Sequence, residues 1–248
     1  KLNLENLKFT YVDSIDSTIQ GISLDIAPGK FVAFVGPSGG GKSTLIDLIL
    51  GLLAPSSGSI RISELAPVDA IKKWPGSIGY VPQDVFIENS TVKENICLGF
   101  DPKTVSDQLV WDALKLADLS EFIEGLDRQL SYKISDAGKN LSGGQRQRLG
   151  IARALLTKPK IVIFDEASQI PLANALGTIQ RSSHVIVAGD EHQMGPQSYF
   201  KKGGDEQMDL LHQASYYWKK TPLTHHYRSE HPKLITFSNR QFYKNKLQ

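Results

Sequence analysis

The chain has very little cysteine, and its other shortages narrow the kind of protein it can be. One cysteine, Cys97, stands among 248 residues, so no internal disulfide can form and no cysteine cluster can hold a metal ion. The longest apolar runs, at 31–36 and 44–53, fall short of the roughly 20 residues that a membrane-spanning helix needs. We therefore expect a soluble, cytoplasmic chain with no cleavable leader.

Charge of one sign is also lacking, and histidine is absent from most of the chain. Lys and Arg total 28 against 26 Asp and Glu, so the formal net charge of +2 gives no general attraction for nucleic acids or membranes. All six histidines lie at His184 or beyond, and from Ala167 onward the basic residues outnumber the acidic ones. These shifts hint that the chain has two origins.

Residues 30–53 read in order as a buried strand, a glycine-rich loop and an amphipathic helix with apolar positions at Leu45, Leu48 and Leu52. Within this unit GPSGGGKS, residues 36–43, satisfies the phosphate-loop pattern G-x-x-x-x-G-K-[ST]. Glycines let successive backbone N–H groups point at phosphate oxygens, and the helix adds the positive end of its dipole. The pattern predicts a nucleoside triphosphate site.

The residue types of this loop predict their roles. Lys42 is expected to reach the β- and γ-phosphates, and the Ser43 hydroxyl to ligate Mg²⁺. Further phosphate contacts are expected from the small residues of the loop and the start of its helix, which are Gly36, Ser38, Gly39, Gly40, Gly41 and Thr44.

From Lys1 to about Glu166 the chain resembles the ATP-binding subunit of an ABC transporter, most closely of the exporter type. The motifs FTY, VPQD, LSGGQRQR and IVIFDE occur in the order of that family. The resemblance implies that Tyr11 stacks on adenine and that Gln83 reaches Mg²⁺ and the attacking water. It also implies that Asp165 holds Mg²⁺ and that Glu166 polarises the water.

LSGGQ, which begins at Leu141, is the most specific of these motifs. The resemblance implies that Ser142 and Gly144, with Gly143 and Gln145 of the same motif, meet a nucleotide held by a second subunit. The family hydrolyses ATP between two subunits arranged head to tail and works beside membrane domains. We therefore expect ATP, Mg²⁺ and a head-to-tail homodimer as ligands and partner, and no transport by this chain alone.

The resemblance changes after DEAS, residues 165–168, because the SALD-like loop and the strand-ending histidine of ABC subunits do not follow. From Asp165 onward the chain resembles the first RecA-like domain of a superfamily 1 helicase, through DEASQ, GDEHQMGP and HHYRSEHP. By this resemblance Gln193 senses the γ-phosphate, and Arg228 neutralises transition-state charge. The sequence thus predicts an engineered or recombined chimera of two P-loop families, joined at their shared motif.

Both resemblances imply an α/β P-loop NTPase with a mainly parallel, helix-flanked sheet, an N-terminal antiparallel β part and an inserted helical subdomain. We expect a nucleotide-binding core at 1–83 and 141–168 and the helical subdomain at 84–140. The helicase-like segment, 169–248, is expected to complete the same sheet.

Two functions remain open from the sequence. The first is Mg-ATP binding with slow hydrolysis, in which Glu166, Lys42, Gln193 and Arg228 act on the nucleotide, either across a homodimer or within one chain. The second is a non-catalytic scaffold that keeps the motifs as passengers. The missing ABC histidine and dimer loop favour the scaffold, since lost charge stabilisation costs ~3 kcal/mol or more of barrier. Unwinding is not expected, and nucleic-acid binding is expected to be absent or weak.

Overall fold

The structure, a computed structural model, describes residues 1–223 except 13, 15, 181 and 194–207. Its strands form two sheets, a five-stranded sheet in the order β5-β6-β7-β3-β8 and a three-stranded sheet in the order β2-β1-β4. The strands are β1 (Leu2–Phe9), β2 (Ile19–Ile26), β3 (Phe31–Val35), β4 (Ser57–Ile62), β5 (Ile78–Val81), β6 (Ile161–Phe164), β7 (His184–Gly189) and β8 (Lys219–Pro222).

The larger sheet is parallel throughout, and the smaller one is antiparallel. The helices are α1 (Lys42–Ile49), α2 (Pro67–Lys73), α3 (Val92–Ile96), α4 (Asp107–Leu116), α5 (Ser120–Glu124), α6 (Gly143–Leu155), α7 (Leu172–Ile179) and α8 (Leu210–Tyr217). Three short 3₁₀ turns are η1 (Gln129–Ser131), η2 (Asp136–Gly138) and η3 (Ala167–Gln169). Within the described ranges, no helix is long and apolar enough to cross a bilayer.

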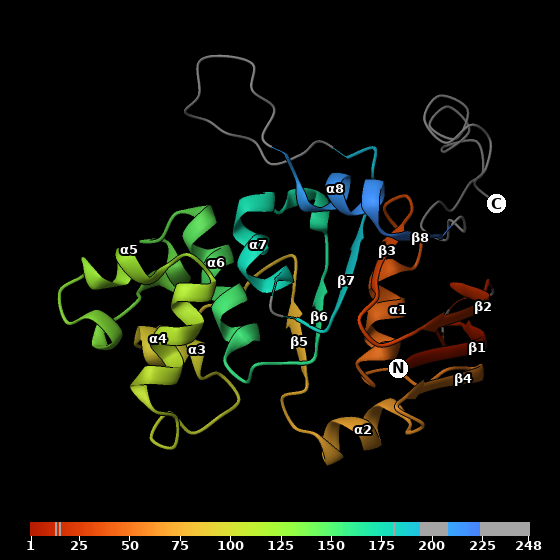
Figure 1. Cartoon of the computed structure of the whole chain (residues 1–248), viewed down its shortest axis with the longest axis horizontal. Helices are drawn as coiled ribbons and strands as arrows, with labels where there is room; N and C mark the ends of the chain where they lie inside the picture. The colour runs from red at the N-terminus through yellow and green to blue at the C-terminus, as the bar shows by residue number, and fades with distance from the viewer. Residues whose placement is uncertain (13, 15, 181, 194–207, 224–248) are drawn as a thin grey trace.

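The parallel sheet separates two hydrophobic cores, because successive side chains of a strand point to opposite faces. In β3, Val32 and Phe34 belong to one core, and Ala33 and Val35 belong to the other. The first core also contains α1 and the antiparallel sheet, whereas the second contains α3, α4 and α6. The antiparallel sheet and the helical part therefore lie on opposite sides of the parallel sheet (Figure 1).

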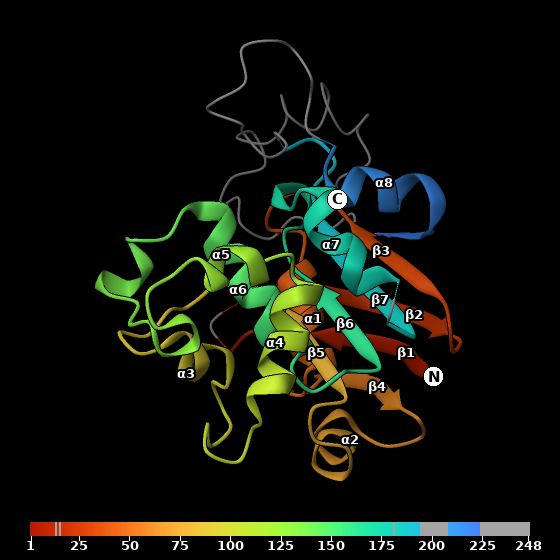
Figure 2. The same cartoon turned by 60° about the vertical axis from the view of Figure 1, so that its left-hand side comes forward.

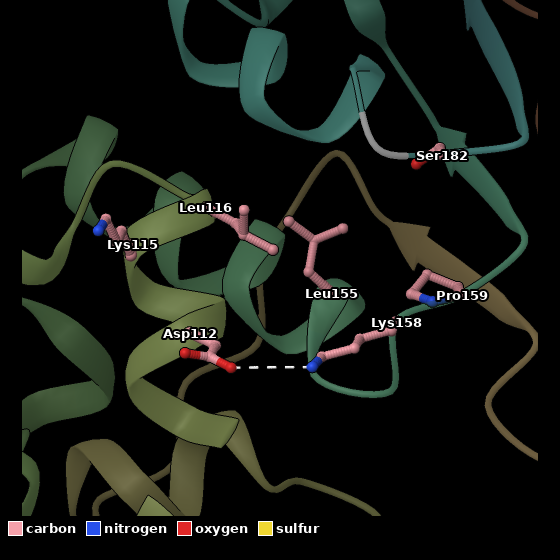
Figure 3. A pocket seen from close by; sticks show the side chains of 7 residues that line it. All are labelled: Asp112, Lys115, Leu116, Leu155, Lys158, Pro159 and Ser182. Carbon is pink, nitrogen blue, oxygen red and sulfur yellow. Dashed lines mark ion pairs between the residues drawn. The ribbon is translucent and has the colours of Figure 1, made fainter. Parts of the chain in front are cut away.

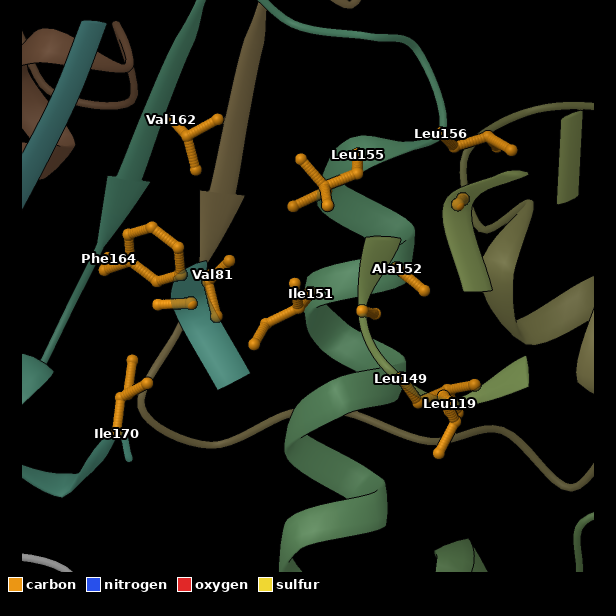
Figure 4. Packing of buried hydrophobic residues seen from close by; sticks show 14 of the residues in the cluster. Val81, Leu119, Leu149, Ile151, Ala152, Leu155, Leu156, Val162, Phe164 and Ile170 are labelled. Atoms are coloured by element: carbon orange, nitrogen blue, oxygen red, sulfur yellow. The ribbon is translucent and has the colours of Figure 1, made fainter. Parts of the chain in front are cut away.

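Helix α6 is the main element on the second face of the sheet. Figure 4 shows Ile151 and Leu155 of α6 turned toward Val81 of β5 and Phe164 of β6. Phe164 is 0% exposed, and burying a side chain of that size stabilises the fold by roughly 1.5–3 kcal/mol. This packing fixes the axis of α6 against the strand that carries the two acids.

Helix α1 ends earlier than the spacing of its leucines predicts. Leu45 and Leu48 are fully buried, but the helix ends at Ile49, and Leu52 is 71% exposed. Gly51 follows with φ 70°, a left-handed conformation that glycine adopts without strain. The prediction that Leu52 continues the apolar face of the helix is therefore wrong.

The segment after Glu166 is part of the same parallel sheet. β7 lies between β6 and β3 at the centre of the sheet, and β8 pairs with the outer side of β3. Helix α7 packs beside α6, and α8 packs against β3 and β7 (Figures 1 and 2). The predicted fold class, an α/β P-loop fold with a parallel sheet and an N-terminal antiparallel part, is confirmed.

Candidate functional site

A polar cavity of about 210 Å³ lies at the carboxyl ends of four neighbouring strands. Such ends meet at one edge of a parallel sheet, where ligands of open α/β folds bind. The loops after β3, β5, β6 and β7 all contribute, although they are far apart in the sequence. The lining residues are Ser38, Gly39, Gly41, Lys42, Ser43, Thr44, Gln83, Glu166 and Gln193.

The phosphate-loop pattern forms the expected turn into α1. Gly41 precedes the helix with φ 83°, and a Cβ at this residue would come within 3.0 Å of the Thr18 carbonyl oxygen. Lys42 opens the helix and is 4% exposed; its Nζ donates to the carbonyl oxygens of Gly36, at 2.9 Å, and Pro37, at 2.8 Å. Lys42, at the exit of the loop, thus places its ammonium group on the entry of the loop, beside the cavity.

Gly36 is enclosed by the C-terminal segment. Its N–H donates to the Gly189 carbonyl oxygen at 3.2 Å, and the Leu223 N–H donates to the Val35 carbonyl oxygen at 2.7 Å. A Cβ at Gly36 would clash with the backbone carbonyl of Leu223. Gly36 is therefore required by packing against the end of β8, and it does not line the described cavity wall. Gly40, whose N–H donates to the Pro37 carbonyl oxygen at 2.9 Å, shapes the turn.

The acid pair after β6 divides into a buried and a cavity-lining member. Asp165 is 5% exposed, and its Oδ1 accepts the Glu166 N–H at 3.0 Å. Glu166 has φ 47°, a left-handed conformation that is uncommon outside glycine, and it lines the cavity. This turn places the two carboxyl groups of adjacent residues in different surroundings.

Two titratable residues that the sequence analysis did not single out lie beside Asp165. Burial, and then the charges of Asp165 and Asp47 and a hydrogen bond to Asp165, raise the pKa of the Tyr80 phenol well above its usual value. Burial and the charge of Asp165 raise the pKa of the Asp47 carboxyl. The alternation of β5 was the available signal, since it turns Ile78 and Tyr80 to the face that α1 covers.

Tyr11 lies near the phosphate loop but is not among the lining residues of the cavity. Its hydroxyl is 3.0 Å from the Thr44 hydroxyl, and its ring meets the Phe9 ring edge to face at 4.8 Å between centroids. Tyr11 is 37% exposed. An aromatic ring is thus held at the surface beside the N-terminal turn of α1.

The LSGGQ motif lies apart from the cavity, at the N-terminus of α6. Ser142 accepts the Gln145 N–H at 3.2 Å, while the Gln145 side chain accepts the Ser142 N–H at 2.8 Å, which is a capping box. Ser142, Gly143 and Gly144 are exposed. A Cβ at Gly144 would meet no described heavy atom within 4 Å, so packing among the described residues gives no reason for a glycine there.

Behind the motif, α6 is tied to α7 by a buried amide that the sequence analysis also missed. Asn174 is 4% exposed; its Oδ1 accepts Arg148 Nε at 3.0 Å, and its Nδ2 donates to Gln147 Oε1 at 3.2 Å. Arg148 also pairs with Asp118 at 3.1 Å. The signal available in the sequence was an asparagine, Asn174, within the mostly apolar stretch that forms α7.

A larger hollow of about 640 Å³ lies elsewhere, between α4, the end of α6 and the loops before β6 and β7 (Figure 3). Leu116, Leu155 and Pro159 line it, together with Asp112 and Lys158, which are 3.7 Å apart. It contains none of the predicted site residues. The smaller cavity is the better candidate because backbone and side-chain groups suited to phosphate converge there.

Most of the predicted residues fall into three groups, and Tyr11, Gly36 and Gly40 lie near the cavity without lining it. Lys42, Ser43, Gln83, Glu166 and Gln193 share the cavity with Ser38, Gly39, Gly41 and Thr44, and Asp165 lies buried next to Glu166. The LSGGQ residues form a separate exposed helix end. Arg228 lies outside the described residues.

This combination of a parallel sheet, a lysine-bearing glycine loop and an acid pair on a neighbouring strand defines a P-loop NTPase fold. The model of the ABC transporter family matches residues 19–169. The chain therefore belongs to the ABC transporter family.

The relatives are ABC transporter proteins that are much longer than this chain. A multidrug resistance ABC transporter ATP-binding and permease protein of Lactococcus lactis is 36% identical over 190 residues, covering 76% of this chain and 32% of the relative. An uncharacterized ABC transporter ATP-binding protein of Bacillus subtilis, YwjA, is 34% identical over 242 residues, covering 87% of this chain and 41% of the relative.

A solved structure is similar as well. It is a bacterial Atm1-family ABC exporter with ATP bound, with a TM-score of 0.66 and 32% identity, covering 75% of this chain and 34% of the other. The chain spans about a third of the length of the curated relatives that it matches first. The resemblance to the exporter-type nucleotide-binding subunit is confirmed.

Proposed function

We propose that the chain binds Mg-ATP at the 210 Å³ cavity and hydrolyses it slowly. The observation that supports this most is the convergence of Lys42, Gln83, Glu166 and Gln193 from four separate strand ends. A lysine, two amides and a carboxylate that share one polar hollow are suited to a triphosphate with its attacking water. The solved relative with ATP bound agrees with this ligand.

Phosphate binding follows from the geometry of the loop. The ammonium of Lys42 lies on the Gly36 and Pro37 carbonyl oxygens at 2.8–2.9 Å. A phosphate offers the ammonium a charged acceptor, which forms a stronger hydrogen bond than a neutral carbonyl. The N-terminal N–H groups of α1 add the positive end of its dipole.

The residues present fit Mg²⁺. Hard oxygen ligands suit this ion, which is usually held by one or two carboxylates, hydroxyls and substrate phosphates while it keeps several waters. Ser43 and Gln83 line the cavity, and Asp165 lies beneath it. Bound there, Mg²⁺ would neutralise phosphate charge. Glu166 would orient and polarise the attacking water, and Tyr11 would stack on the base.

The outward-facing LSGGQ motif supports a head-to-tail homodimer. We propose that Ser142 and Gly144 of one copy approach the nucleotide of the other, with the helix dipole of α6 directed at the γ-phosphate. The exposed Gly144, which no contact with the described part of the chain requires, fits such an approach. We place the dimer at the inner, cytoplasmic face of a membrane, beside the membrane domains that exporters of this family use.

We also propose that the segment from about 165 onward derives from a helicase-like RecA domain. The GDEHQ run supports this, since its Gln193 lines the same cavity as Gln83. In that arrangement Gln193 senses the γ-phosphate within one chain, and Arg228 supplies the neutralising charge. On the same two resemblances we propose three parts of the chain. They are a nucleotide-binding core at 1–83 and 141–168, a helical subdomain at 84–140 and a helicase-like segment at 169–248.

The binding experiment compares Lys42→Ala with wild type by calorimetry using Mg-ATP. We expect the affinity to fall by about 100-fold, because a charged donor with two phosphate contacts is lost. Lys30→Ala is the matched control, since Lys30 is an exposed lysine just before β3. Binding by a folded Lys42→Ala variant that equals wild type would contradict the proposal.

The turnover experiment measures steady-state ATP hydrolysis over a wide range of protein concentration, with Glu166→Gln as the blank. Activity per chain that rises with concentration and is lost in Ser142→Arg supports the dimer. Activity that is independent of concentration and lost in Gln193→Ala supports action within one chain. Binding without activity above the blank would establish the alternative, a non-catalytic scaffold that retains the motifs.

A further inference from the structure

Asp190 follows β7 and makes two backbone contacts with one buried carboxylate. Oδ2 accepts the Ser38 N–H at 3.0 Å, and Oδ1 accepts the His192 N–H at 3.0 Å. Asp190 is 3% exposed, and among the described residues it is not part of the cavity wall. Its two carboxylate oxygens therefore accept hydrogen bonds from two different segments beside the cavity.

The first segment is the entry of the phosphate loop. Pro37 has no N–H, so Gly36 and Ser38 carry the two backbone donors at this point of the loop. The Gly36 N–H goes to the Gly189 carbonyl oxygen at 3.2 Å, and the Ser38 N–H goes to Asp190. Both donors are thus bound by the end of β7, and Ser38 then begins the cavity wall.

The second segment is the turn that carries Gln193. Besides the His192 N–H on Oδ1, the backbone carbonyl of Asp190 accepts the Gln193 N–H at 3.2 Å. Aspartate side chains stabilise tight turns by such bonds to the backbone two residues ahead. This turn places Gln193 in the cavity wall, which Gln83 also lines from the end of a different strand.

We propose that Asp190 is a positioning residue that holds the phosphate loop and the Gln193 turn in a fixed relation to one another. One rigid side chain connects the two walls of the cavity, so a change at one wall is transmitted to the other through Ser38 and His192. The inference rests on the proposed function for its ligand, Mg-ATP, but the two backbone contacts lie within the chain itself.

The first test is amide hydrogen exchange of the nucleotide-free chain carrying Asp190→Asn. An asparagine side chain has one acceptor oxygen and an NH₂ donor, so one of the two backbone N–H groups loses its acceptor. We expect exchange to rise by about tenfold or more in the segment that loses its acceptor, which is the one around Ser38 or the one around His192. Asp209→Asn is the matched control, because Asp209 makes the same kind of bond to the His212 N–H at 2.7 Å at the start of α8.

The second test is a double-mutant cycle of Asp190→Asn and Gln193→Ala on Mg-ATP affinity. Asp190→Asn is expected to weaken Mg-ATP by about tenfold. If Asp190 acts by placing Gln193, the combined loss is smaller than the product of the two single losses. A structural defect unrelated to the cavity would give multiplicative losses.

The outcomes separate this inference from the proposed function. Unchanged exchange around Ser38 and His192 in Asp190→Asn overturns the inference whether or not the chain binds Mg-ATP. Faster exchange with independent affinity losses overturns it too. Absence of Mg-ATP binding by wild type refutes the proposed function, and exchange alone then decides the positioning role. Should Asp190→Asn not fold, Asp190→Glu keeps charge and both acceptors, and the same local rise of smaller size is expected.

Discussion

The phosphate-loop cavity and the LSGGQ helix end differ in how far one chain completes them. The cavity is enclosed by loops from four strands, and its glycine loop is packed against the ends of β7 and β8. The LSGGQ residues are capped internally, yet Ser142, Gly143 and Gly144 are exposed. The comparison thus sets a site built within the chain against an exposed helix end, for which we propose a contact with a second copy.

Gly36 and Gly144 differ in the same way, in what surrounds them within the chain. Gly36 is required because a Cβ would clash with the carbonyl of Leu223, whereas Gly144 has open space around it. A glycine without a packing reason, at an exposed helix start, is available for contact with another molecule. Packing among the described residues therefore explains the glycine at position 36, and it does not explain the glycine at position 144.

The largest expected effect is that of Gly36→Ala. Backbone atoms cannot move aside as a flexible side chain does, so we expect the free energy of unfolding to fall by about 3 kcal/mol. Gly144→Ala is the matched change, and we expect its free energy of unfolding to stay within about 0.5 kcal/mol of wild type. Urea unfolding of both variants measures the difference.

Gly36→Ala and Gly144→Ala also test whether the LSGGQ helix end contacts a second copy during ATP hydrolysis. Gly144→Ala should leave Mg-ATP binding intact while lowering the concentration-dependent turnover, since the added methyl group stands on the proposed contact surface. Equal losses of stability in Gly36→Ala and Gly144→Ala would remove the distinction between the two regions.

A smaller effect is expected from Asn174→Ala. The change leaves the half-buried side chains of Gln147 and Arg148 without their amide partner, which costs about 1–2 kcal/mol. Thermal unfolding measures it, with the exposed residue Asn140 changed to Ala as the control. A loss of stability in Asn174→Ala no larger than that in Asn140→Ala would mean that the contacts of Asn174 do not stabilise the packing of α7 against α6.

The smallest effect concerns His184, at the end of β7 remote from Asp190. His184 is 8% exposed, and burial is the first cause that lowers the pKa of its imidazole below 6.5. The unfolded chain therefore binds this proton at higher pH than the folded chain does, and stability falls as the pH drops below 6.5 toward the folded pKa.

This slope is at most about 1.4 kcal/mol per pH unit, because one proton is exchanged. Urea unfolding between pH 7.5 and about pH 5.5 measures it, and His184→Gln, which cannot gain the proton, should flatten it. A slope that is identical in the variant would assign the pH dependence to other groups.

The sequence by itself determined the local units. The order of strand, glycine loop and helix at 30–53 predicted the phosphate loop, although the helix ends at Ile49. The cap of the LSGGQ helix is local as well, because Ser142 and Gln145 have capping-box spacing. These features depend on residues a few positions apart, which periodicity and turn chemistry describe well.

Only the tertiary structure decided which of these units share a site. It placed β7 between β6 and β3 and β8 beyond β3, and so brought Asp190 to Ser38 and Leu223 to Gly36. It also ended α1 before Leu52 and placed Tyr80 and Asp47 near Asp165. The physical reason is that strand order and close backbone approach depend on packing between segments more than 150 residues apart, which no local pattern encodes.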